Sequence, residues 1–185
     1  MCIKGNRIKL VFATKKDKKL IYEMLTGEEV IDYMFNDQHP VPTWDEFNED
    51  EPEIFFSGKP TKEGSYLLIY YNGEVIGSIS YSNEFRKQVH SELDIWIGTN
   101  KYLGIGLGRE AINLLIDYLN KEYLIDVFLI RPWIENINAI KAYKKCGFQV
   151  IDNFNPEFFY VGDDLKEYGD GDYGKDETIN LIKRI

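Results

Sequence analysis

The sequence predicts one α/β domain over residues 1–185, and three observations support this fold class. Of the residues, 44% are hydrophobic and 15% are aromatic, which is enough to build a sizeable core. Segments with the two-residue period of strands alternate with segments that have the longer period of helices. No internal repeat is visible, and no linker divides the chain. We therefore expect one sheet with helices packed against it.

The first part of the chain predicts one strand and two helical segments. Residues 7–13 alternate and carry β-branched and aromatic side chains, which indicates a strand, and a Lys-rich helix is expected over about 15–26. A second helical segment covers residues 27–35, and two prolines then enforce a loop over residues 36–44. From this loop to about residue 64 we expect irregular, acidic chain.

Residues 66–82 carry the clearest local signal in the sequence. Two strand-like runs flank Asn72 and Gly73, a pair that accepts the positive φ angles of a type I′ turn. We therefore expect a β-hairpin here.

A further strand is expected over residues 92–98, followed by a helix over about 107–121. Because side chains alternate along a strand, three residues should share one face and three the other: Glu92, Asp94 and Trp96, against Leu93, Ile95 and Ile97. The helix should bury the side formed by Ala111, Leu114, Leu115, Tyr118 and Leu119.

The C-terminal part predicts three more strands and a short helix. Residues 126–130 read as a strand, and a helix over 137–146 should begin after a cap at Asn136 and end at Gly147. Two final strands are expected, over residues 157–162 and 178–185.

The acidic loop between those two strands, residues 163–177, suggests calcium at first sight. A calcium-binding loop that starts at Asp170 would need glycine and glutamate where Lys175 and Leu181 stand. We therefore expect no metal and interpret the loop as a solvated hairpin tip.

Charge and composition exclude several classes of function. The formal net charge of −9 argues against nucleic-acid binding, which needs clustered Lys and Arg, and favours a small or cationic partner. The apolar stretches are shorter than the roughly 20 residues that cross a bilayer. Cys2 and Cys146 have no partners at metal spacing, and no signal peptide is visible, so we expect a cytoplasmic protein. The sequence leaves open whether it is a monomer or a homodimer.

Three glycines at 104, 106 and 108 precede the helix over 107–121 and need an explanation. A P-loop would end in Gly-Lys-Ser or Gly-Lys-Thr, but Arg109 follows Gly108. A dinucleotide fingerprint would need glycine at 109 or 111, and neither position carries one. Two interpretations remain: an anion site at the first turn of a helix, or a plain strand-to-helix turn.

The segments "YLGIGLG" and "ENINAIKAYKKCGF" resemble, in order, the two signature motifs of the GCN5-related N-acetyltransferase (GNAT) family. The first motif falls on Leu103, Gly104, Ile105, Gly106, Leu107 and Gly108, and the second on Asn136, Ala139, Tyr143, Gly147 and Phe148. The resemblance implies the GNAT fold, a mixed and mostly antiparallel twisted sheet flanked by helices.

The same resemblance implies acetyl-coenzyme A as co-substrate. Its pyrophosphate would lie on residues 103–109, and its pantetheine arm would follow the main chain of Ile95, Trp96 and Ile97. Asn136, Ala139 and Tyr143 would also contact the cofactor. The chain departs from the family at two positions: Leu103 replaces the usual Gln or Arg, and Ile105 replaces a frequent basic residue. Backbone amides should therefore carry most of the phosphate contact, helped by Lys101 or Arg109.

For the chemistry, the resemblance places a general acid at Tyr143, with a core tyrosine as the alternative. Asp94 and Glu92 are the candidate bases, because a strand flanked by apolar residues rarely carries two carboxylates on one face without a partner. A structural salt bridge is the alternative for them.

The acceptor should be a small cationic amine, because acidic residues crowd residues 28–53. The motifs look most like those of aminoglycoside 6′-N-acetyltransferases, so an aminoglycoside 6′-amine is favoured. Polyamines and the N-terminal amines of proteins remain alternatives. A different class also remains, a non-catalytic module that binds acyl-coenzyme A.

Overall fold

The computed structural model describes residues 1–185, and its strands form one eight-stranded sheet in the order β1-β2-β3-β4-β5-β6-β8-β7. Neighbouring strands are antiparallel except β5 and β6, which are parallel, so the expected mixed and mostly antiparallel sheet is confirmed. The strands are β1 (Cys2–Lys4), β2 (Ile8–Phe12), β3 (Gly64–Tyr71), β4 (Glu74–Glu84), β5 (His90–Ile97), β6 (Val127–Ile130), β7 (Gln149–Val150) and β8 (Leu181–Arg184).

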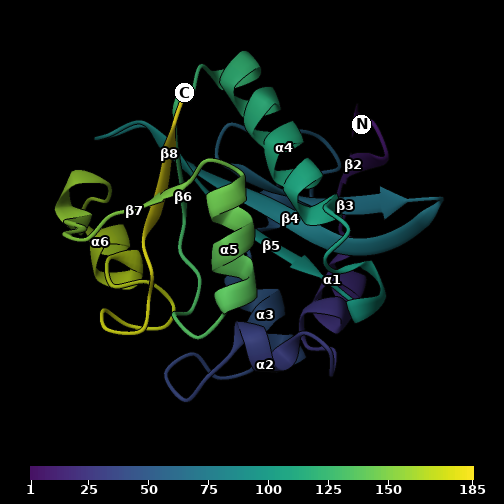
Figure 1. The fold of residues 1–185 in the computed structure, drawn as a ribbon, viewed down its shortest axis with the longest axis horizontal. Helices are drawn as coiled ribbons and strands as arrows, with labels where there is room; N and C mark the ends of the chain where they lie inside the picture. Colours follow the sequence, from purple (N-terminus) through teal and green to yellow (C-terminus); the bar gives the residue numbers. More distant parts are fainter.

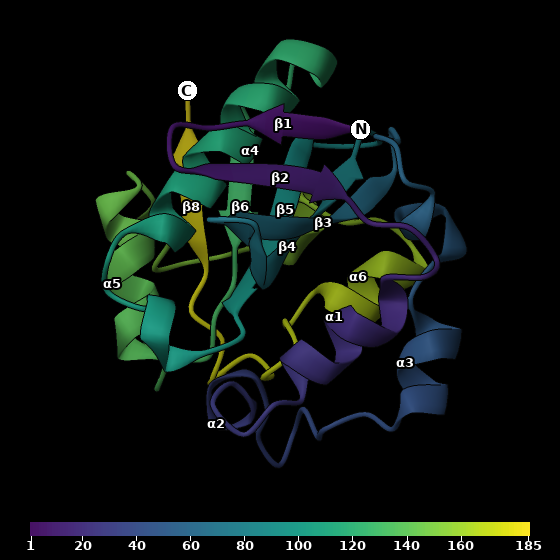
Figure 2. The ribbon, with the colours of Figure 1, turned by 90° about the vertical axis from the view of Figure 1, so that its right-hand side faces the viewer.

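Helices cover both faces of this sheet (Figures 1 and 2). On one face lie α4 and α5, and on the other lie α1, α3 and α6. The helices are α1 (Lys18–Leu25), α2 (Ile31–Met34), α3 (Trp44–Asp50), α4 (Leu107–Tyr123), α5 (Ile137–Lys145) and α6 (Asp163–Tyr168). No helix is long and apolar enough to cross a membrane.

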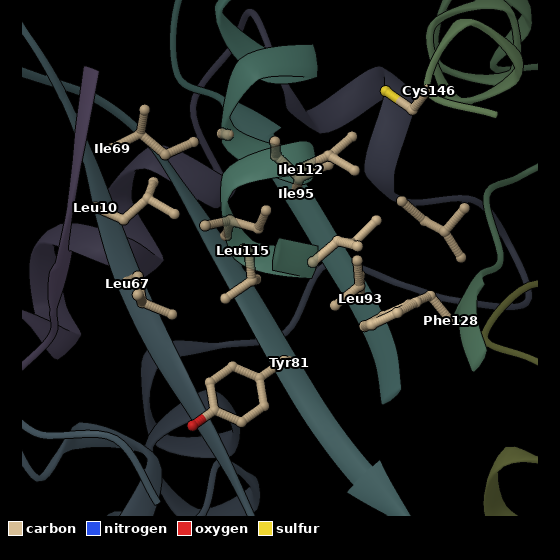
Figure 3. Packing of buried hydrophobic residues seen from close by; sticks show 14 of the residues in the cluster. Leu10, Leu67, Ile69, Tyr81, Leu93, Ile95, Ile112, Leu115, Phe128 and Cys146 are labelled. Atoms are coloured by element: carbon tan, nitrogen blue, oxygen red, sulfur yellow. The ribbon is translucent and has the colours of Figure 1, made fainter. Parts of the chain in front are cut away.

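The main core lies between the sheet and α4 and contains 24 buried residues (Figure 3). The predicted alternation on β5 is confirmed, since Leu93 and Ile95 enter this core whereas Trp96 enters a second cluster on the opposite face. The expected face of α4 is also buried: Ala111, Leu115 and Leu119 are fully enclosed, and Leu114 and Tyr118 are half-buried.

The hairpin of β3 and β4 turns at the predicted pair. Asn72 has φ 50° and Gly73 has φ 87°, the two positive angles that a type I′ turn requires. The antiparallel pairing of this hairpin continues with β5, which pairs with β4 from His90 to Ile97.

Three predictions about local structure are wrong, and one of them is the hairpin tip expected over residues 163–177, whose first part forms the helix α6. Residues 157–162 form no strand; a 3₁₀ turn at Pro156–Phe158 leads into α6 instead, and the short strand β7 takes the place beside β8. Proline removes a ladder donor, and Phe159 and Tyr160 both pack on Val127 and Leu129, which an alternating strand could not do.

The segment expected to be irregular contains α3. Its signal was local and was missed: Thr43 and Glu46 form a capping box, in which the Thr43 N–H donates to Glu46 Oε2 at 2.7 Å. The short edge strand β1 was also not predicted.

The most consequential feature of the sheet is that β5 and β6 separate. They pair only at Ser91 with Phe128 and at Glu92 with Leu129. Gly98 N–H bonds to Ile76 O across to β4, so by alternation the main-chain groups of Ile95 and Ile97 face away from β4, into the gap. This gap opens beside the glycine loop and α5.

Candidate active site

The glycine loop has the geometry of an anion site at a helix start. Gly104 and Gly106 have φ of 76° and 86°, in the left-handed region that favours glycine. Gly106 is the N-cap of α4, and no side chain caps the helix. The first N–H groups of α4, beginning at Leu107, therefore stay available to an anion.

Two guanidinium groups flank this loop. A Cβ atom built on Gly106 would lie 3.4 Å from Arg7 Nη2 and 3.7 Å from Arg109 Nη2. Arg7 is held by Glu110, with 2.8 Å between Nε and Oε2, and its Nη1 donates to Ile105 O at 3.0 Å. The arrangement supplies positive charge where Leu103 and Ile105 supply none.

Sequence reasoning missed Arg7 and kept Lys101 as a candidate. Lys101 turns away from the loop, with its Nζ 3.9 Å from Glu74 Oε2 and over the ring of Tyr102. Arg7 lies 98 residues from Ile105 in the sequence, and nothing local marks it.

A cleft of about 730 Å³ runs from the glycine loop to α5. The structure brings together in its lining every residue predicted to contact the cofactor: Ile95, Trp96, Ile97, Leu103, Gly104, Ile105, Gly106, Leu107, Gly108, Arg109, Asn136, Ala139 and Tyr143. More than half of the lining is apolar, and the polar side chains in it include Arg109 at the loop and Lys141 and Lys145 on α5, which suits a ligand with an anionic head and a long thin arm.

The start of α5 is fixed against this cleft by Asn136. Its Oδ1 accepts from Ala139 N–H at 3.2 Å, as predicted for a cap, and its Nδ2 donates to Tyr33 O at 3.2 Å. Gly147, with φ 92°, ends the helix at the predicted residue. These two ends set the position of Tyr143 on α5.

Tyr143 is 7% exposed, and its hydroxyl makes no hydrogen bond within the protein. Burial, followed by the charge of Asp94, raises the pKa of the phenol well above its ordinary value. The group is therefore protonated at neutral pH and free to donate.

Asp94 lies next to the cleft residues Ile95 and Trp96, with its side chain open to solvent. Oδ1 accepts from the Ile95 N–H at 2.8 Å. Surrounding protein, and then the charges of Asp172, Glu51 and Glu92, raise the pKa of Asp94 to about 7. A carboxylate with this pKa can accept a proton near neutral pH.

Glu92, the other candidate base, is already paired. Its Oε2 accepts from the Tyr160 hydroxyl, and its Oε1 lies 3.7 Å from Arg131 Nη1. This arrangement favours the salt-bridge interpretation for Glu92 and leaves Asp94 as the unpaired carboxylate on that face of β5.

Comparison with known proteins gives one family. A model described as an acetyltransferase (GNAT) domain matches residues 7–149. The chain is 30% identical over 100 residues to the spermine/spermidine N(1)-acetyltransferase of Bacillus subtilis (strain 168), covering 51% of this chain and 63% of that protein. The probable N-acetyltransferase san of Drosophila melanogaster is 26% identical over 86 residues, covering 46% of this chain and 47% of that protein. The chain thus spans less than two thirds of these relatives.

Solved structures share the fold over almost the whole chain. Aminoglycoside acetyltransferase AAC(6′)-Ib in complex with coenzyme A and kanamycin has a TM-score of 0.69 at 17% identity, covering 96% of this chain and 94% of that one. Spermidine N-acetyltransferase from Vibrio cholerae, in complex with coenzyme A and spermine, has a TM-score of 0.67 at 18% identity, covering 96% and 95%. At these identities the likeness shows the fold.

The placement of Arg7 predicts a contribution to coenzyme A binding. Replacing Arg7 with Gln should weaken binding by about tenfold, because one guanidinium near a phosphate is worth roughly 1–2 kcal/mol. Calorimetric titration measures this, and Lys101→Gln is the matched control because it removes the same charge from a residue turned toward Glu74. Equal losses in both variants would show that only net charge matters.

The environment of Asp94 predicts a stability effect that depends on pH. Asp94→Asn should raise the melting temperature at about pH 8.5 and raise it less at about pH 5.5. Above pH 7 the folded protein holds a charge that the surrounding protein and the neighbouring carboxylates disfavour, whereas between its ordinary pKa of 3.8 and about 7 the folded state keeps the proton and the penalty shrinks. Scanning calorimetry at both pH values measures this, and an unchanged melting temperature at the higher pH would contradict it.

Proposed function

The chain belongs to the acetyltransferase (GNAT) family, and we propose that it transfers an acetyl group from acetyl-coenzyme A to a primary amine of a small cationic acceptor. The observation that carries this proposal is the cleft itself, which is positive at the glycine loop and holds the unbonded Tyr143 hydroxyl, with Asp94 next to its lining residues Ile95 and Trp96 and near enough for its charge to raise the pKa of Tyr143. Amide formation needs one group that accepts a proton and one that donates a proton, and the Asp94 carboxylate and the Tyr143 hydroxyl can do this.

The co-substrate is oriented by the charge of the cleft. Its pyrophosphate lies on the first turn of α4, between Arg7 and Arg109, and its arm follows Ile95 and Ile97 through the gap. The thioester then reaches Tyr143.

The reaction proceeds by direct attack. Asp94 takes a proton from the acceptor ammonium, and the freed nitrogen lone pair attacks the thioester carbon. The C–N bond forms and the C–S bond breaks, so coenzyme A leaves as a thiolate. Tyr143 gives the thiolate its proton, and the second proton lost by the nitrogen restores Tyr143.

The charge beside Asp94 supports a cationic acceptor. Of the acidic residues that crowd residues 28–53, Glu51 lies close enough to raise the pKa of Asp94. Others have structural roles: Glu29 accepts from Asn100 N–H at 2.8 Å, Glu46 caps α3, and Glu53 pairs with Lys15. The attraction of an amine therefore rests on few carboxylates, close to the reaction centre.

The first acceptor class is an aminoglycoside, through its 6′-amine, supported by the motifs and by the shared fold with AAC(6′)-Ib. Linear polyamines are the second class, because the curated relative with 30% identity is a spermine/spermidine acetyltransferase. Both are small polycations. A module that binds acyl-coenzyme A without turnover would not need Asp94 beside Tyr143.

Tyr143→Phe should lower kcat by about one to three orders of magnitude, with little change in the KM for acetyl-coenzyme A, because only the proton donor is lost. The hydroxyl bonds to nothing in the protein, so the ring should pack as before. Steady-state thiol release measures both constants. An unchanged kcat would show that Tyr143 is a core residue and not the proton donor.

The acceptor and the base are tested together. The panel is kanamycin, tobramycin, spermidine and short peptides, read out by thiol release. With the preferred acceptor, kcat/KM should rise as the pH passes about 7, because Asp94 must be ionised to take the proton. Asp94→Asn should abolish that rise and lower kcat/KM by about 100-fold or more, whereas Glu92→Gln should keep it. Activity on peptides alone would overturn the proposed acceptor class.

A further inference from the structure

The wall of the cleft that α5 forms carries an inner and an outer stripe of residues. Ala139 is half-buried and Tyr143 is buried, and these two belong to the inner stripe. Lys141 and Lys145 also line the cleft but are exposed, so they lie at its outer edge. Residues four apart on a helix are neighbours, with about 5–6 Å between their Cβ atoms, so both ammonium groups can reach one ligand.

The charged side chains that line the cleft are mostly cationic, although the chain has a net charge of −9. The cations are Arg109, Lys141 and Lys145. The only carboxylate in the lining is Glu29, and its Oε2 already accepts from the Asn100 N–H at 2.8 Å. The cleft therefore presents positive charge in two places, at the glycine loop and along α5.

Lys141 and Lys145 are free to bind an anion. The ion pairs of the molecule all lie elsewhere, and neither ammonium group donates a hydrogen bond within the protein. Two like charges one helical turn apart repel each other, and an anion held between them replaces this repulsion with attraction.

Coenzyme A carries two separate anionic groups, a pyrophosphate and a phosphate monoester on the 3′-oxygen of its ribose. The open first turn of α4, with Arg7 and Arg109 beside it, accounts for the pyrophosphate. The 3′-phosphate then still needs a partner. A phosphate monoester carries up to two charges on three oxygens, and ammonium groups on flexible stems suit such a group.

We propose that Lys141 and Lys145 bind the 3′-phosphate of coenzyme A, so that the protein selects coenzyme A over dephospho-coenzyme A, which lacks this group. The inference rests on the proposed function, in which acetyl-coenzyme A is the acetyl donor. It adds two residues that neither sequence motif contains. The proposed acceptor does not compete for this place, because the same lysines repel a cationic amine.

The decisive measurement is calorimetric titration of coenzyme A and dephospho-coenzyme A into the wild-type protein and the double variant Lys141→Gln/Lys145→Gln. We expect the wild type to bind coenzyme A about tenfold more tightly, because two exposed ion pairs are gained with the 3′-phosphate. In the double variant this preference should fall to within about twofold. The affinity for dephospho-coenzyme A should change by less than about twofold, and glutamine, a good helix former, keeps α5 intact.

Lys144→Gln is the matched control, because Lys144 lies on the same helix, is exposed, carries the same charge and does not line the cleft. It should keep the tenfold preference for coenzyme A. A wild type that binds the two compounds equally would overturn the proposal. So would a loss of preference in Lys144→Gln as large as the loss in the double variant.

The titration needs no acceptor, so it separates this inference from the proposed function. A preference that the wild type shows and the double variant loses supports the site even where no amine is acetylated. Acetyl transfer with equal KM values for acetyl-coenzyme A and its dephospho analogue would overturn the site and leave the proposed function standing. If the wild type binds neither compound, both the inference and the proposed function are wrong.

Discussion

The separation of β5 and β6 after Glu92 is the constraint on which the rest of the site depends. Main-chain groups inside a protein must find partners, and here the groups of Ile95 and Ile97 have no neighbouring strand. The gap also lets groups from opposite faces of the sheet meet. Tyr143 belongs to α5 on one face and Asp94 points to the other, yet the charge of Asp94 acts directly on the Tyr143 phenol. A continuous β5–β6 ladder would keep them apart.

The two ends of the site carry opposite charge, although the whole chain is acidic. Arg7, Arg109 and the open first turn of α4 make the loop end positive, whereas Asp94 lies beside the lining residues Ile95 and Trp96, and other carboxylates are near enough to raise its pKa. Such an arrangement favours an anionic ligand at one end and a cationic ligand at the other. The net charge of −9 is a sum over the whole chain and does not give the local charge at either end.

Arg131 connects the fold to this electrostatic arrangement. Burying a guanidinium is unfavourable unless its donors are satisfied, and here hydrogen bonds to four groups and the nearby Glu92 carboxylate satisfy them. The same contacts occupy Glu92 and hold the loop that carries Asp172. One buried cation thereby pairs with a carboxylate of β5 and fixes the chain at the end of α6.

The sequence by itself determined what depends on neighbours in the chain. The turn at Asn72, the alternation along β5, the cap at Asn136 and the glycine loop all follow from φ preferences, side-chain period and hydrogen bonds a few residues apart. The resemblance to the family supplied the residues that are expected to contact the cofactor, and all of them line one cleft in the structure.

Only the tertiary structure decided which charges face one another. Arg7 reaches the glycine loop from 98 residues away, and Arg131 and Glu177 hold the chain between Tyr168 and Glu177 in place. Neither position has a local pattern, and a loop of Asp, Gly and Lys looks the same in sequence whether it is solvated or built into a wall. The pairing of Glu92 also depends on the fold, because its partners, Tyr160 and Arg131, come from segments that only the folded chain brings to β5.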